Sequence, residues 1–214
     1  MSHLFSNDAA SWLHWIDLLG VAVFAISGTL MAHKQHLDGI GVVVLASVTA
    51  VGGGTLRDLI LDVPVFWVTD NSYLYAILLA ALLTIVWVRR RGRFPLRFLL
   101  HADAIGLAFF NIMGAQKALS MGVNPVVAIM MGTMSGVFGG LLRDVICREI
   151  PLVLKGELYA TACIIGGILY SLCLQLNWDS QLSMAIGIAC TLAIRLLAMR
   201  YHWQLTVFHP PANH

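Results

Sequence analysis

The sequence predicts an all-α integral membrane protein with seven transmembrane helices. Of its 214 residues, 59% are hydrophobic and only 11% are charged, and the mean hydropathy is +0.82. A soluble domain carries roughly 25% charged residues, so this chain has too few of them to face water on all sides. Apolar stretches of ~17–25 residues are typical of membrane-spanning helices. The alternation over ~10-residue segments that indicates a transmembrane β-barrel is not seen.

The predicted spans follow one another closely, so residues 1–214 are expected to form a single membrane domain. The seven spans cover residues 17–33, 40–61, 72–88, 102–120, 124–146, 157–175 and 182–200.

The basic residues predict the orientation of the chain. With seven spans, residues 34–39, 89–101, 147–156 and the C-terminal tail lie on one side of the membrane. On this side or at the adjoining helix ends are Lys34, Arg89, Arg90, Arg91, Arg93, Arg97, Arg148, Lys155, Arg195 and Arg200, whereas the other side has no Lys or Arg. Cytoplasmic loops carry such an excess, so we expect the N-terminus outside and the C-terminus in the cytoplasm.

Residues 17–88 and 103–174 are expected to form two related units of three helices, followed by a seventh helix at 182–200. Without a gap, Asp17, Gly20, Phe24, Gly28, Gly53, Gly54, Leu56, Arg57, Asp58 and Tyr73 align with Asp103, Gly106, Phe110, Gly114, Gly139, Gly140, Leu142, Arg143, Asp144 and Tyr159. Because three spans are an odd number, the second unit must cross the membrane in the opposite sense. Such inverted 3+3 repeats recur in transport proteins, with the substrate path at the repeat interface.

Glycines inside the second and fifth spans are the candidates for a pore. They are Gly52, Gly53 and Gly54, followed by Gly139 and Gly140 in the second unit. Glycine costs ~1 kcal/mol in a helix interior, so we expect a kink or a break at these positions. Carbonyls freed in a membrane need protein or water as partners, and they are the ligands that a partly dehydrated cation uses in transit. A kink that serves packing alone is the alternative interpretation.

Charged residues recur at matching places in the two units. We expect Asp17, Arg57 and Asp58 to gather toward the outer side, and Asp103, Arg143 and Asp144 toward the cytoplasm. A charge at a helix centre costs ~2.5–3.5 kcal/mol on insertion scales, so these groups should face one another or water. Each group is therefore either a structural clamp or a pore mouth.

Lys117 breaks the repeat, because Met31 stands at the matching position of the first unit. Its side chain either extends to the outer surface, as long basic side chains do, or places one positive charge in the path, where it would gate cations.

Other classes of function find no support in the sequence. No HExxH, GxSxG, P-loop or dinucleotide motif is present, so an enzyme is not expected, nor is a cofactor or a tightly bound metal. The basic run "RRRGRFPLR" lies at a membrane edge, where it can touch anionic lipid heads, and it gives no reason to expect nucleic-acid binding.

Two stretches carry a resemblance to a known family. The run "GGLLRDVICREIPLVLKGELYATACIIGGILY" (139–170), together with "GGGTLRDLIL" (52–61), resembles the prokaryotic branch of the TRIC family, the trimeric intracellular cation channels. The same bacterial domain family has been labelled a glycine transporter. The doubled glycine and Arg-Asp motif departs from exact symmetry at Phe138, which replaces the counterpart of Gly52.

The resemblance implies a homotrimer of seven-helix protomers in a membrane. Each protomer is expected to have its own pore for monovalent cations, mainly potassium, gated at the glycines of the second and fifth spans. The chain lacks an ER-retention ending, so we expect the bacterial inner membrane. A secondary transporter of a small amino acid such as glycine remains the alternative, since helix breaks near the midplane also suit a zwitterion.

Overall fold

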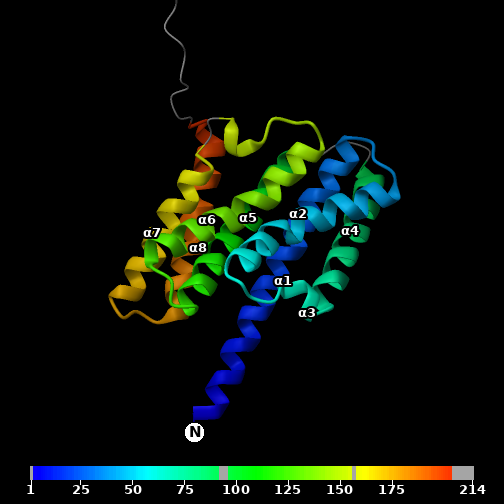
Figure 1. Cartoon of the computed structure of the whole chain (residues 1–214). Helices are drawn as coiled ribbons and strands as arrows, with labels where there is room; N and C mark the ends of the chain where they lie inside the picture. Colours follow the sequence, from blue (N-terminus) through cyan, green and yellow to red (C-terminus); the bar gives the residue numbers. More distant parts are fainter. Residues whose placement is uncertain (1, 92–95, 156–157, 204–214) are drawn as a thin grey trace, which may run out of the picture.

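The computed structural model describes residues 2–91, 96–155 and 158–203, with side chains described for 12–90, 97–155 and 158–203 (Figure 1). The described part is helical throughout. Its elements are α1 (Ser2–Lys34), α2 (Gly39–Ile60), α3 (Phe66–Thr69), α4 (Ser72–Arg91), α5 (Leu96–Ser120), α6 (Pro125–Ile146), the 3-10 turn η1 (Leu152–Leu154), α7 (Ala160–Gln175) and α8 (Ser180–Tyr201).

The helices confirm the predicted fold class. In the described residues, six helices (α1, α2, α4, α5, α6 and α8) are long and apolar enough to cross a membrane, and α7 is a shorter apolar helix. The span predicted at 157–175 begins later, at Ala160. Sixteen residues rise about 24 Å, which is shorter than the ~30 Å hydrocarbon core of a bilayer.

The helices α1 and α5 begin earlier than predicted. The predicted spans start at residues 17 and 102, but α1 starts at Ser2 and α5 at Leu96, so the carboxylates of Asp17 and Asp103 lie inside a helix. Residues 2–16 contain neither Gly nor Pro, so nothing in the chain ends the helix before the apolar span. The membrane-spanning part of α1 is Trp12–Lys34.

Ion pairs show that the two units are inverted. Lys34, at the C-terminus of α1, contacts Glu149 after α6, with Nζ to Oε1 at 2.5 Å. Lys117, near the C-terminus of α5, contacts Asp58 near the C-terminus of α2, with Nζ to Oδ1 at 2.8 Å. The C-termini of α1 and α6 therefore share one end of the bundle, and those of α2 and α5 share the other.

The core lies where α1 and α5 cross, between α4 on one side and α7 with α8 on the other (Figure 1). Phe24 and Phe110 stack there with ring centroids 5.3 Å apart and an interplanar angle of 18°. A Cβ at Gly20 would lie 3.2 Å from Phe110, and one at Gly106 would lie 2.5 Å from Phe24. Gly20 and Gly106 thus leave room for the aromatic ring of the neighbouring helix.

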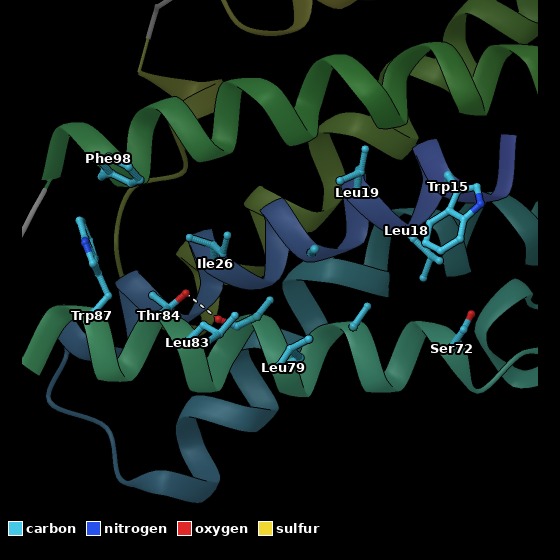
Figure 2. A pocket seen from close by; sticks show the side chains of 13 residues that line it. Trp15, Leu18, Leu19, Ile26, Ser72, Leu79, Leu83, Thr84, Trp87 and Phe98 are labelled. Carbon is cyan, nitrogen blue, oxygen red and sulfur yellow. Dashed lines mark hydrogen bonds between the residues drawn. The ribbon is translucent and has the colours of Figure 1, made fainter. Parts of the chain in front are cut away.

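A wide apolar groove of about 570 Å³ lies between α1 and α4. Figure 2 shows Trp15 at one end of the groove and Trp87 with Phe98 at the other. Thr84 in its wall satisfies its hydroxyl within its own helix, by donating to the Ala80 carbonyl at 2.6 Å. Among the described residues, no matched charge lines this apolar groove, so it is not a candidate ion path.

Candidate functional site

The two Arg-Asp motifs end their helices in the same way. Asp58 Oδ2 accepts a hydrogen bond from the Phe66 backbone N–H at 3.0 Å, and Asp144 Oδ2 accepts one from the Leu152 N–H at 3.0 Å. Each aspartate thus fixes the short helical turn that follows, α3 in one unit and η1 in the other. The neighbouring arginine of each motif donates its Nε to Oδ1 of the same aspartate at 2.8 Å.

The second charge cluster consists of Asp103, Arg143 and Asp144, which are all buried. Arg143 Nη1 lies 2.7 Å from Asp103 Oδ1, and its Nη2 lies 2.8 Å from Asp144 Oδ1. Arg143 also donates to the hydroxyl of Ser27 on α1. The Tyr159 hydroxyl donates to Asp103 Oδ2 at 2.8 Å. The structure therefore brings these three predicted residues together as a closed network.

The first charge cluster consists of Asp17, Arg57, Asp58 and Lys117. Arg57 pairs with Asp58, and Lys117 binds the same carboxylate oxygen of Asp58. Asp17 instead accepts a hydrogen bond from the Tyr73 hydroxyl at 3.1 Å. Between Arg57 and Asp17 the described contacts include no ion pair within 4.0 Å, unlike the matching pair of the second cluster.

Lys117 therefore has a partner that the repeat does not predict. Its side chain is 30% exposed, whereas that of Asp58 is fully buried. The matching position, Met31, is buried beside Arg143 and Asp144 in the wall of a small cavity of about 230 Å³. Lys117 is thus the half-exposed member of a cluster that is otherwise mostly buried.

The glycines of α2 and α6 mark a crossing of two backbones. A Cβ at Gly53 would overlap the carbonyl oxygen of Ser135, and a Cβ at Gly139 would overlap that of Thr49. Ser135 and Thr49 are themselves matching positions of the two units, so the crossing keeps the inverted symmetry. Helices approach this closely in membranes where small residues allow it.

The helix break expected at these glycines is absent, because α2 and α6 are continuous through them. Gly52 lies against the Leu142 side chain and Gly54 against the Phe66 ring, where a Cβ would come within 2.8 Å and 2.6 Å. At Gly140 a Cβ would lie 2.9 Å from Asp103 Oδ1. All five glycines thus sit at close contacts, which explains their presence without a break.

Several polar residues beside the clusters were not identified as site residues from the sequence. Tyr73 and Tyr159 could have been found, because the repeat aligns them 56 residues after Asp17 and Asp103. Arg195 was counted among the basic residues at a membrane edge, but its side chain is fully buried. Its guanidinium carbon lies 4.6 Å from the centroid of the Tyr159 ring.

A further ion pair lies beside the second cluster, between the last residue of the α1 span and the segment after α6. Lys34 and Gln35 both donate to Glu149 Oε1, at 2.5 Å and 3.1 Å. The hydrogen bond from Lys34 and its charge lower the pKa of Glu149 below its usual range. Lys34 and Glu149 line the same cavity as Arg143 and Asp144.

The arrangement fits ion passage better than chemistry on a substrate. In the described part of the chain, no three His, Cys, Asp or Glu side chains are grouped so that they could hold a metal. The clusters instead place mostly buried charges at the two ends of one helix crossing. Intramembrane charges that face the bundle interior mark ion or substrate pathways.

The chain is similar to several known membrane proteins. The sequence model of the family described as "Glycine transporter" matches residues 14–89 and again residues 100–175. The UPF0126 inner membrane protein YadS of Escherichia coli K12 is 48% identical over 202 residues, which cover 92% of this chain and 96% of the relative. A UPF0126 membrane protein of Vibrio cholerae is 48% identical over 199 residues, covering 92% of this chain and 83% of the relative.

Solved structures of TRIC channels share the fold. The TRIC trimeric intracellular cation channel orthologue from Rhodobacter sphaeroides has a TM-score of 0.86 at 36% identity, covering 90% of this chain and all of that one. A prokaryotic TRIC channel solved in 0.5 M KCl has a TM-score of 0.82 at 28% identity, covering 92% of this chain and all of that one. These similarities support a cation channel rather than an enzyme. The chain belongs to the bacterial branch of the TRIC cation-channel family, the family whose sequence model is described as "Glycine transporter".

Proposed function

We propose that the chain is a potassium-permeable channel for monovalent cations, with one pore in each protomer between α2 and α6. The observation that carries the proposal is the crossing of these helices at Gly53 and Gly139, with a charge cluster near the C-terminal end of each helix. Each cluster presents carboxylates to a cation and basic groups that restrain it. Conduction needs binding that is weak and spread over several sites, and paired carboxylates meet that need.

The glycine crossing is the proposed gate. In the described conformation the two backbones touch, so a cation passes only when α2 and α6 move apart. Such a movement uncovers the carbonyl oxygens of Ser135 and Thr49, which we propose as the transient cation ligands. The Ser135 hydroxyl is buried and has no hydrogen-bond partner in the described residues, so it is available to a cation or a water once the crossing opens.

The clusters are the proposed pore mouths. Asp17, Arg57, Asp58 and Lys117 form the outer mouth, and Asp103, Arg143 and Asp144 form the cytoplasmic one. This orientation is supported by six basic residues, Lys34, Arg89, Arg90, Arg97, Arg148 and Lys155. Arg195 does not support it, because its side chain is buried. Arg93 and the side chain of Arg91 lie outside the described residues.

The descriptions of relatives support a proposal for the assembly and the location. The Rhodobacter sphaeroides relative is described as trimeric, and we propose a homotrimer for this chain. YadS is described as an inner membrane protein, and we propose the bacterial inner membrane, where the outward apolar faces contact lipid.

A secondary transporter of glycine is the second candidate, because the family model that matches both units is described as a glycine transporter. In that function the same movement of α2 against α6 would expose a zwitterion to the two mouths in turn.

Flux through purified protein in liposomes tests the choice. We expect potassium current under an imposed gradient, without saturable uptake of labelled glycine. Gly53→Leu is expected to change the current, whereas Gly39→Leu, where a Cβ meets nothing within 4 Å, serves as the matched control. Saturable glycine uptake without ionic current would reject the channel and support the transporter.

A further inference from the structure

We propose that Arg195, on the helix that has no partner in the repeat, is a positioning residue that completes the cytoplasmic mouth as Lys117 completes the outer one. The inference rests on the proposed channel function. It assigns a role to α8, which lies outside both three-helix units.

The charges of the two clusters become equal only when Arg195 is included. The first cluster has two carboxylates, Asp17 and Asp58, and two basic groups, Arg57 and Lys117. Within the repeat, the second cluster has two carboxylates and Arg143 alone. Its formal charge is therefore −1, and Arg195 brings it to zero, as Lys117 does for the first.

Arg195 reaches the second cluster through one aromatic ring. Its guanidinium lies over Tyr159, within the ~6 Å range of a cation–π interaction. The hydroxyl of that ring donates to Asp103, which in turn pairs with Arg143. A cation–π contact is strongest where water is excluded, so Arg195 fixes the position of the Tyr159 ring, and the hydroxyl of that ring fixes Asp103.

The face of α8 that carries Arg195 is fixed independently of the charge. Thr191 lies one turn before Arg195, and both are fully buried. Asn111 Nδ2 of α5 donates to Thr191 Oγ1 at 3.2 Å and to the Cys163 carbonyl of α7 at 2.9 Å. Packing of α8 thus has its own polar anchor, and a buried guanidinium one turn away is not needed for it.

Lys117 and Arg195 differ in how freely their side chains can move away from their clusters. Lys117 is 30% exposed on a flexible stem, while Arg195 is 0% exposed under the ring of Tyr159. The outer mouth can therefore lose its fourth charge when Lys117 swings away, and the cytoplasmic mouth keeps its own. The formal charge of the cytoplasmic mouth therefore stays at zero, whereas that of the outer mouth changes when Lys117 moves.

Currents in excised patches of giant spheroplasts, where the protein keeps one orientation, test this assignment. In symmetric potassium chloride, Arg195→Met leaves the cytoplasmic mouth with a net negative charge. We expect the ratio of outward to inward current to rise at least twofold, because cations then gather at the cytoplasmic end. Arg195→Lys is expected to restore most of the wild-type ratio.

The matched control is Thr191→Val on the same face of α8. It removes the bond from Asn111 and leaves every charge in place, so it is expected to lower thermal stability without changing the current ratio. An unchanged ratio in Arg195→Met, or an equal change in Thr191→Val, would overturn the assignment and leave Arg195 a packing residue.

If Arg195→Met does not assemble, Tyr159→Leu provides a second test. Tyr159→Leu keeps the guanidinium but removes the ring between it and Asp103, and the ratio is expected to shift in the same sense by a smaller factor. If the ratio of outward to inward current in Tyr159→Leu equals that of the wild type, the coupling of Arg195 to Asp103 through the Tyr159 ring is rejected. Absence of potassium current in wild-type patches would instead reject the proposed channel, so the two failures are distinguishable.

Discussion

The two charge clusters carry the same motif and differ in how tightly it is held. In the second cluster Arg143 joins both aspartates and the Ser27 hydroxyl in a fully buried network. In the first cluster Arg57 binds Asp58 but makes no described ion pair with Asp17. The Arg-Asp motif therefore builds the local helix end, while neighbouring residues decide whether the cluster is closed.

Two positions account for much of the difference. Ser27, which binds Arg143, is matched by Met113 in the other unit, so Arg57 has no equivalent hydroxyl from that position. Met31 beside the second cluster is matched by Lys117 beside the first. Each cluster thus has a polar neighbour, Ser27 or Lys117, at a position where the other cluster has a methionine.

The largest expected effect is the loss of Asp103. Breaking a buried ion pair by removing one partner costs ~3–5 kcal/mol, so Asp103→Asn should lower the melting temperature in detergent by roughly 10 °C. Asp17→Asn breaks no described ion pair and keeps an oxygen that accepts from Tyr73, so it should cost no more than ~0.5–1.5 kcal/mol. Equal shifts for the two variants, measured by thermal unfolding of the purified protein, would contradict the difference in closure.

The glycine crossing is expected to rank second. Gly53→Ala and Gly139→Ala gain up to ~1 kcal/mol of helix propensity, but overpacking against a carbonyl costs ~1–3 kcal/mol, so both should destabilise. Gly52→Ala should be milder, because the nearest atom is the end of the flexible Leu142 side chain. Melting temperatures, with Gly39→Ala as control, check the order, and a milder Gly139→Ala than Gly52→Ala would overturn it.

Lys117→Met copies the residue of the matching position and should loosen the outer mouth. A coupling of roughly 1 kcal/mol between a half-exposed ammonium and Asp58 corresponds to a factor of about five, so we expect cation current to rise by about that factor. Lys117→Arg, which keeps the charge, is the control. A current unaffected by Lys117→Met would show that this lysine does not restrain cations.

The pair of Lys34 and Glu149 should give the smallest effect. Because the pKa of Glu149 is lowered in the folded protein, its stabilisation is present above the ordinary glutamate pKa and is lost as the pH falls through the lowered value. Exposed pairs contribute ~0.2–1 kcal/mol. Below pH 4.5, the difference in melting temperature between wild type and Glu149→Gln should shrink, and a constant difference would exclude the pair as its source.

The sequence was sufficient for the fold and for most members of the clusters. Hydropathy located the spans, and the matched Asp and Arg-Asp positions named the residues that the second cluster brings together. It failed at Arg195, because position near a helix end does not reveal which way the helix is turned. At the glycines a kink or a break was expected, and the break is absent because α2 and α6 are continuous there. Helix propensity is a local quantity, and contact with the carbonyls of Ser135 and Thr49 arises only after the helices pack.

The glycine crossing divides α2 and α6 into arms of unequal length. Gly53 lies fourteen residues from the start of α2 and seven from its end, and Gly139 divides α6 in the same way. At 1.5 Å per residue the arms are about 21 and 10 Å, so a rocking motion moves one end of each helix twice as far as the other. Because α2 and α6 run in opposite directions, the long arm of one lies beside the short arm of the other. In such a rocking motion, each end of the bundle would combine one large displacement with one small displacement.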